Sequence, residues 1–269
     1  MTGPIPVIEA VEWREPAPGG GSQAQVFRLS DGRFAVVKFP ENPQGELVLT
    51  NEFLSCQIAE ILDLPVNRAV MASIDERLLR LPRQNGQIPA AFSAGIRCGM
   101  IRFEKAEGTQ LANILNHCQN SPELHSVLVL DQLVCQMNAG QFLMYPTDEG
   151  STKKFGAHDY GYAFGGTPQW SLATLAGMPP AGLPTTDPFN GQPYPDGSKL
   201  TSIIDRLRKV TDAHFTQTLM KLHPPRWGAT LADVQALAPV LYARAQALIQ
   251  QFDQRYPKEQ LEVLPDVHN

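Results

Sequence analysis

The chain has 269 residues, of which 43% are hydrophobic and 18% charged, a composition typical of a globular protein that can bury a core. A formal net charge of -5 argues against broad nucleic-acid binding, because phosphate backbones attract clustered lysine and arginine. No apolar run reaches the ~20 residues that a membrane-spanning helix needs, so we expect no membrane association.

The N-terminus and the cysteines indicate the compartment. Residues 1–11 lack the basic and apolar regions of a secretory signal. Cys56, Cys98, Cys118 and Cys135 form no CxxC pair, and we interpret them as reduced core thiols rather than as disulfides or zinc ligands. Together these features predict a cytoplasmic protein.

The first patterned segment is a glycine cluster at 19–21, which leads into a strand-like run at 26–29. An Asp31-Gly32 turn follows, and then a second apolar run at 34–39. Two β-rich runs joined by an Asp-Gly turn predict an antiparallel hairpin with the glycines at its open end.

Residues 47–62 change to helical spacing, with Leu49 and Phe53 on an apolar stripe. We predict further strands at 68–74 and near 99–103. The hairpin, the helix and these strands make a small α+β unit of about a hundred residues.

Beyond Thr109 the pattern is mainly helical. We predict an apolar helix at 124–134 and a long helix at 231–252. The segment 178–197 contains six prolines, which exclude a helix. It predicts an irregular loop that either shapes a groove for a substrate or partner, or is a surface insertion.

The glycine cluster is the first candidate for chemistry. Gly20 and Gly21 beside a strand allow backbone N–H groups to approach a phosphate without a Cβ in the way. Ser22 and Gln23 would add side-chain donors. A flexible loop without a ligand is the alternative interpretation.

Lys38 lies inside the apolar run at 34–39. If Val36 faces the core, strand alternation places Lys38 on the same inner face. A lysine there needs an anion, and the two candidates are Glu52 on the next helix and a bound phosphate. The alternative is a surface lysine on an edge strand.

Asp159 is the third candidate, between a short apolar approach and Gly161. A carboxylate at such a turn can hold Mg²⁺ that bridges two phosphates. A turn-forming aspartate without a metal is the alternative. We interpret His158 as a packed or hydrogen-bonded histidine.

The order of these parts is that of a protein kinase: glycine-rich hairpin, strand lysine, helix glutamate, apolar helix with a polar loop, then Asp-x-Gly. The usual Val-Ala-Ile-Lys, His-Arg-Asp and Asp-Phe-Gly motifs are absent. The chain does resemble the HipA-like kinase family, a bacterial branch of atypical Ser/Thr kinases, over roughly residues 18–252. The stretches that carry the resemblance are Gly20-Gly21-Ser22, residues 34–39, Asn42-Pro43-Gln44-Gly45, residues 49–53, Leu64-Pro65-Val66, residues 158–164 and residues 223–227.

The resemblance implies an α+β, bilobal protein-kinase-like fold, with a small β-rich N-lobe at 1–108 and a mainly helical C-lobe at 109–269. It further implies that ATP and Mg²⁺ bind between the lobes. Lys38 would contact the nucleotide phosphates, Glu52 would orient Lys38, and Asp159 would hold the metal. Residues 100–107 would lie near the interlobe hinge and the adenine.

The chain departs from the family in the catalytic loop, where the family has roughly Asn-x-Asp-Arg and then a metal-binding asparagine. Here Asn138 stands at the general-base position and Gln141 at the second metal position. A neutral amide cannot accept the substrate proton, and glutamine is one methylene longer, which disturbs the octahedral geometry that Mg²⁺ demands. A shifted alignment would use Asp131 or Asp148, but we expect Asp131 in a helix and Asp148 in a turn, both away from the site.

Three functions remain open. The first is a Ser/Thr kinase-like enzyme with weak or altered phosphate transfer to an unknown protein substrate. The second is a pseudokinase that acts as a regulatory or interaction module for an unknown partner. The third is transfer of another group such as AMP, or transfer to a small molecule.

Overall fold

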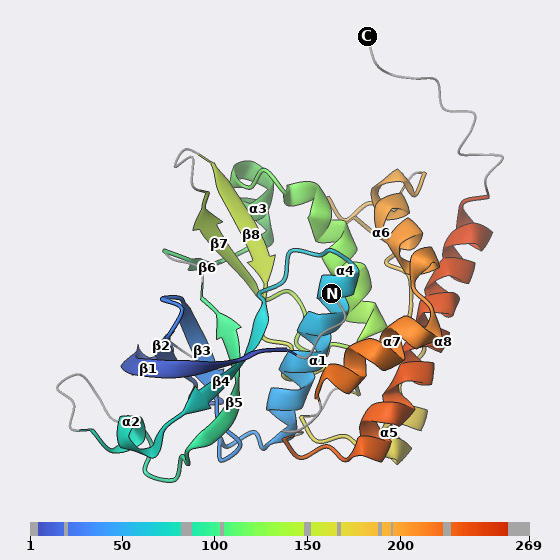
Figure 1. Ribbon diagram of the computed structural model, residues 1–269. Coiled ribbons are helices and arrows are strands. Elements are labelled where there is room, and N and C mark those ends of the chain that lie inside the picture. Colours follow the sequence, from blue (N-terminus) through green and yellow to red (C-terminus); the bar gives the residue numbers. More distant parts are fainter. Residues whose placement is uncertain are drawn as a thin grey trace.

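The computed structural model describes residues 5–18, 21–81, 88–102, 105–147, 152–165, 168–187, 190–194, 196–222 and 227–257. Five strands gather on one side of the molecule, and long helices lie on the other (Figure 1).

The five strands form a closed barrel in the order β1-β2-β3-β5-β4. Their bounds are β1 (Val7–Pro16), β2 (Gln25–Leu29), β3 (Phe34–Lys38), β4 (Ala69–Ile74) and β5 (Gly95–Ile101). The predicted hairpin is β2 and β3, paired antiparallel. β1, which the sequence did not predict, pairs antiparallel with β2 and parallel with β4, and so closes the barrel.

The two faces of β3 serve different purposes. Ala35 and Val37 point into the barrel core, which they share with Phe27 and Phe39. Strand alternation therefore turns Lys38 away from the barrel interior, on the same face as the half-buried Val36. The assumption that the core lies on the Val36 face was wrong, because the barrel encloses the opposite face. Lys38 is nevertheless buried, and it pairs with Glu52, one of the two anions expected for it.

That helix, α1 (Leu47–Ile61), is buried along its first thirteen residues. It contacts β4 and β5 on one side and α7 on the other, and Figure 1 shows it between the barrel and the orange and red helices. Burial on nearly every side is typical of a helix in such a central position. Glu52 is consequently only 1% exposed.

A second, three-stranded sheet has the order β6-β7-β8, antiparallel throughout. Its strands are β6 (Glu107–Thr109), β7 (Phe142–Pro146) and β8 (Lys153–Ala157). The β7–β8 hairpin connects the expected catalytic loop to Asp159. The other helices are α2 (Glu76–Arg80), α3 (Leu111–His117), α4 (Leu124–Leu133), α5 (Leu172–Ala176), α6 (Ser198–Lys209), α7 (Asp212–Leu219) and α8 (Leu231–Arg255), with single 3₁₀ turns at η1 (Ser121–Glu123) and η2 (Met220–Leu222).

The proline-rich segment forms no helix in its described residues, as predicted. It lies along α8, where Arg244 donates to the Pro179 carbonyl, and Gln251 donates to the Ala181 carbonyl at 2.8 Å. Arg255 donates to the Pro184 carbonyl. The described part of this segment is therefore a packed layer of the helical half.

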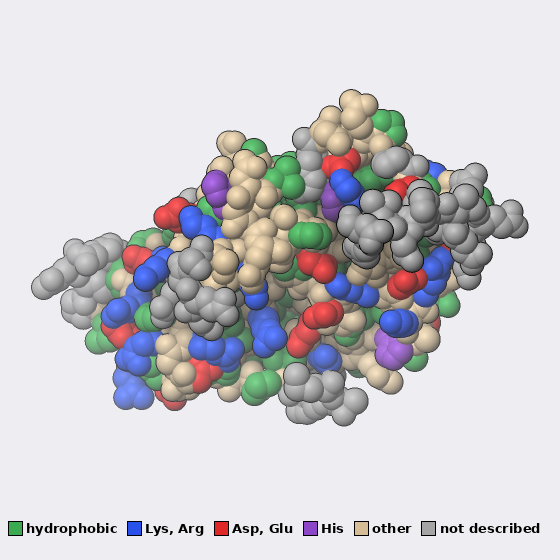
Figure 2. All heavy atoms as spheres, turned by 90° about the horizontal axis from the view of Figure 1, so that it is seen from above, with side chains coloured by type: hydrophobic (Ala, Val, Ile, Leu, Met, Phe, Trp, Pro, Cys, Tyr) green, Lys and Arg blue, Asp and Glu red, His purple; other side chains and the backbone are tan. Residues whose placement is uncertain are grey.

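The four cysteines are free and buried, as predicted. Within the described part of the chain, no helix is long and apolar enough to cross a membrane. On the face seen in Figure 2, basic and acidic side chains are interspersed. The division of the chain at residue 108, and the expectation about nucleic acids, stay predictions.

The turn between β3 and α1 gives a test of the backbone. Gly45 has φ +91°, and a Cβ there would lie 2.0 Å from Gln169 Nε2. We expect Gly45→Ala to lower the free energy of unfolding by about 1–3 kcal/mol, the range for a strained left-handed residue. Gly108→Ala is the matched control, since no atom lies within 4 Å of its Cβ position. Urea denaturation measures both variants, and equal stability would contradict the strained turn.

Candidate functional site

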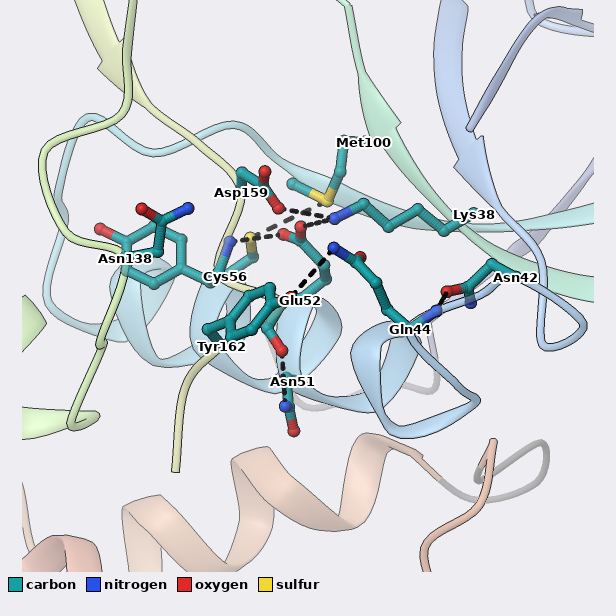
Figure 3. Close-up of polar contacts among 12 residues, drawn as sticks. Lys38, Asn42, Gln44, Asn51, Glu52, Cys56, Met100, Asn138, Asp159 and Tyr162 are labelled. Atoms are coloured by element: carbon teal, nitrogen blue, oxygen red, sulfur yellow. Dashed lines mark hydrogen bonds and ion pairs between the residues drawn. The ribbon is translucent and has the colours of Figure 1, made fainter. Parts of the chain in front are cut away.

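Lys38 stands at the centre of a buried ion network. Its Nζ donates to Glu52 Oε1 and, at 2.7 Å, to Asp159 Oδ1. The second oxygen of Glu52 accepts the backbone N–H of Tyr160 at 3.0 Å. Figure 3 shows Lys38 and Asp159 converging on Glu52 from different elements. The contact between Lys38 and Glu52 that the sequence indicated is present, and Asp159 joins it.

Burial and charge act against each other in this network. Burial raises the pKa of Glu52 to about 7. Burial alone would lower the pKa of Lys38, but the charges of Glu52 and Asp159 outweigh it and raise that pKa. Burial would also raise the pKa of Asp159, yet the Lys38 ammonium outweighs it and holds this pKa at about 2. At neutral pH Lys38 is therefore cationic, and Asp159 is an ionised carboxylate able to bind a cation.

The backbone at Asp159 adopts an unusual conformation, with φ +60°. Aspartate tolerates the left-handed region better than most residues. Gln136 Nε2 donates to the Asp159 carbonyl at 2.8 Å, and Asn51 Nδ2 donates to the Gly161 carbonyl at 2.8 Å. A Cβ at Gly161 would lie 3.0 Å from Val48 Cγ1. The Asp-Tyr-Gly sequence thus permits a tight turn that aims the carboxylate at Lys38.

The loop at 136–141 runs beside Asp159. The N–H of Met137 donates to the Tyr162 carbonyl at 3.4 Å, and the N–H of His158 donates to the Gln141 carbonyl at 3.1 Å. Asn138 is exposed, and Figure 3 shows it next to Asp159. Asn138 and Gln141 line one small pocket. The structure therefore brings both residues to the site, and their catalytic and metal-binding roles stay predictions.

Asp131 lies closer to this site than we expected. It is a residue of α4, as predicted, but it lines the same pocket as Asn138, Gln141 and Tyr160. The helix ends two residues after Asp131, so the following loop folds back over its carboxyl group. Asp131 is only 4% exposed, and burial raises its pKa to about 7. The expectation of a distant Asp131 was wrong, although its carboxyl group remains beneath the loop and away from solvent.

The glycine-rich segment is described in part. Gly20 lies outside the described residues. Gly21 is exposed, and a Cβ there would lie 3.0 Å from Gln44 Nε2. Ser22 is buried, whereas Gln23 is exposed with φ +50°. Within the described residues, Lys38 donates hydrogen bonds to Glu52 and Asp159 and not to Ser22 or Gln23. The expected contacts of residues 20–23 with a phosphate stay a prediction.

Several polar residues that hold the site together were not assigned from the sequence. Asn51, next to Glu52, accepts a hydrogen bond from Trp170 Nε1 at 2.6 Å while it donates to Gly161. Gln44 Nε2 donates to the Tyr162 hydroxyl at 3.2 Å. Uncharged amides show no periodic pattern in the sequence that reveals a role.

The donor set fits a metal that is shared with phosphates. Among the described residues, no group of three or more histidine, cysteine, aspartate or glutamate side chains could hold a metal ion by itself. Asp159 offers one ionised carboxylate, and Gln141 lies at the neighbouring pocket. Mg²⁺ usually takes one or two protein carboxylates and completes its shell with substrate phosphates and water. The residues therefore suit a metal that arrives with a nucleotide.

Comparisons with known proteins place the fold. No family model and no curated protein matches the sequence. Among solved structures, the proinflammatory kinase CtkA of Helicobacter pylori superposes with a TM-score of 0.60 at 14% identity, over 98% of this chain and 100% of that one. The Golgi casein kinase gives 0.53, and the same kinase with Mn and ADP bound gives 0.51, both at 11% identity over 98% of this chain and 78% of theirs. The chain therefore has a kinase-like fold with mixed helices and strands.

The ion network predicts a pH-dependent effect of Lys38→Met. Without the cation, Glu52 and Asp159 face each other, and the folded-state pKa of Glu52 rises further above its usual range. A carboxyl group with a raised folded-state pKa takes up a proton on folding, so the variant regains stability as the pH falls. We expect a deficit of about 3–5 kcal/mol at pH 8 and a deficit smaller by about 1–3 kcal/mol at pH 5.5.

Urea unfolding at the two pH values measures this difference. Lys209→Met, at an exposed position of α6, is the control and should show no pH-dependent deficit. An equal deficit for Lys38→Met at pH 8 and pH 5.5 would show that Glu52 does not respond to the lysine.

Proposed function

We propose that the protein is a HipA-like, kinase-fold phosphotransferase that binds ATP with Mg²⁺ beside Lys38 and transfers phosphate slowly to a serine or threonine of a protein substrate. The observation that carries the proposal is the buried network of Lys38, Glu52 and Asp159. We further propose the bilobal division of the fold, with the nucleotide between the barrel and the helices.

Lys38 supports phosphate binding because one N–H of its ammonium group has no acceptor among the described residues. An ammonium group has three N–H donors, and Glu52 and Asp159 take two of them. The remaining donor is free for a phosphate oxygen. Glu52 keeps Lys38 in place because its other oxygen is held by the backbone of Tyr160. A fixed, charged lysine of this kind matches the role of the strand lysine in kinases.

Asp159 supports the metal part of the proposal, with Gln141 as the second protein ligand. A divalent ion bound there would neutralise charge on the phosphates. The matching structure of the Golgi casein kinase contains Mn and ADP, which favours a nucleotide and a divalent ion as ligands of this fold.

Asn138 explains why we propose slow transfer. An exposed amide beside Asp159 can orient a hydroxyl group, but it cannot accept the proton. Loss of a general base typically lowers a rate by ~10²–10⁴. Phosphoryl transfer depends largely on positioning and electrostatics, so some activity is compatible with Asn138.

The second candidate function is a pseudokinase, a regulatory or interaction module for a partner protein. Asn138 and Gln141 favour it. The general-base position carries a neutral asparagine in place of an aspartate, and the second metal position carries a longer glutamine in place of an asparagine. Transfer of AMP, or transfer to a small molecule, is a third candidate that shares the same nucleotide site.

Nucleotide binding is tested by calorimetric titration of the full chain with ATP and Mg²⁺. We expect Lys38→Ala and Asp159→Asn each to weaken binding at least about tenfold, because each removes a charge-assisted contact. Lys209→Ala is the control and should bind as the unaltered protein does. Unchanged affinity in both site variants would refute the assignment of this site. Asp159→Asn answers the question even if Lys38→Ala does not fold, since Asp159 is partly exposed.

Catalysis is tested by restoring the carboxylate with Asn138→Asp. Incubation with γ-labelled ATP and a cell lysate should then give at least about ten times more transfer than the unaltered protein. This gain should be lost when Asp159→Asn is added. An absence of label from γ-labelled and from α-labelled ATP, with the unaltered protein and with Asn138→Asp, would favour the pseudokinase, because AMP transfer keeps only the α-phosphate on the product. Mass spectrometry of the product distinguishes an added phosphoryl group from an added AMP.

A further inference from the structure

The turn between β3 and α1 is held in one shape by its own asparagine. Asn42 is 5% exposed. Its Nδ2 donates to the Phe39 and Gly45 carbonyls, and its Oδ1 accepts the N–H of Gln44 at 2.8 Å. The Asn42 side chain therefore makes its hydrogen bonds within residues 39–45, which we call the Asn42 turn. Since these bonds fix the backbone of Gln44, they also fix where its side chain can reach.

The carboxamide of Gln44 lies where three segments of the site meet. Its Nε2 donates to the hydroxyl of Tyr162, three residues after Asp159, at 3.2 Å. The same Nε2 lies 3.0 Å from the Cβ position of Gly21, at the end of the glycine cluster. Figure 3 shows the Gln44 side chain directed inward, toward the region of Lys38 and Glu52. The backbone carbonyl of Gln44 accepts a hydrogen bond from Gln169 Nε2 at 3.2 Å.

This placement gives Gly21 a second reason to be glycine. A Cβ at position 21 would lie in tight contact with the Gln44 carboxamide, which would have to move by a few tenths of an ångström. The glycine therefore leaves room for the amide as well as for a phosphate. Kinases hold the nucleotide phosphates between a glycine-rich loop and the segment that carries the metal-binding aspartate. The Gln44 carboxamide lies between Gly21 and Tyr162.

The bond from Gln44 to Tyr162 is of a kind that a phosphate can replace. It is a neutral amide-to-hydroxyl contact at a partly exposed position, and hydrogen bonds to charged acceptors are roughly twice as strong as neutral ones. An amide N–H released from the hydroxyl would meet a phosphate oxygen without any change in the Asn42 turn.

We propose that Gln44 is a phosphate-binding residue, which donates its carboxamide N–H to the β- or γ-phosphate of the bound nucleotide. This inference rests on the proposed function, because it requires that ATP binds beside Lys38. It adds a contact from the Asn42 turn that is independent of the lysine and of the metal.

The test is calorimetric titration of the full chain with ATP and with AMP at constant Mg²⁺. Gln44→Ala should weaken ATP binding about tenfold or more, the loss expected for a hydrogen bond to a charged group, and should leave AMP binding unchanged. Gln44→Glu should weaken ATP binding further, because its carboxylate repels phosphates, while it can accept a hydrogen bond from the Tyr162 hydroxyl in place of the one that Gln44 donates. Gln250→Ala, at an exposed position of α8, is the matched control and should stay within about twofold.

ATP binding by the unaltered protein distinguishes a failure of the Gln44 contact from a failure of the proposed function. If the unaltered protein binds ATP and the Gln44 variants bind it equally well, Gln44 does not contact phosphate. An equal loss of ATP and AMP in those variants would instead show a structural role, and would also overturn the inference. If the unaltered protein binds no ATP, the proposed function itself fails, and the role of Gln44 fails with it.

Discussion

The buried ammonium group of Lys38 is the constraint on which the site depends. A charge out of contact with water is stable only when opposite charges and hydrogen bonds surround it. Glu52 and Asp159 supply these charges from positions 14 and 121 residues further along the chain. The barrel strand that carries Lys38, the central helix that carries Glu52 and the turn after β8 must therefore meet at one point.

The helix α1 makes this meeting possible because it is buried on nearly every side. Two consecutive residues of the helix act on the same turn: Glu52 binds the Tyr160 N–H, and Asn51 binds the Gly161 carbonyl. Gln136 binds the carbonyl of Asp159 from the opposite side. Asp159 is thus held from both directions, and such support places a functional group in a defined position before any ligand arrives.

The two halves of the site differ in charge. The side around Lys38 has a cation held by two carboxyl groups, whereas the loop at 136–141 carries neutral amides, of which Asn138 is exposed. The buried carboxyl group of Asp131 lies beneath that loop. Neutral amides bind divalent ions and accept protons less well than carboxylates do. This difference is the physical reason why nucleotide binding is better supported than rapid phosphate transfer.

Local patterns in the sequence determined much of this arrangement. The apolar run at 34–39 and the helical spacing over residues 47–62 predicted the hairpin and the helix, and they gave Glu52 as one of two candidate partners for Lys38. Short turn signals predicted the bend at Asp159, and the order of these parts predicted a kinase-like fold. Each of these features depends on residues close together in the chain, so periodicity and turn chemistry reveal them.

The tertiary structure alone decided the rest. β1 closes the barrel through parallel pairing with β4, and its mixture of charged and apolar residues gave no strand signal. Asp131 lies under the loop because the chain reverses direction after α4. Gln44 meets Tyr162 across 118 positions of sequence. The pairing of β1 with β4 and the contact of Gln44 with Tyr162 join segments far apart in the chain. They arise only once the hydrophobic core has brought those segments together.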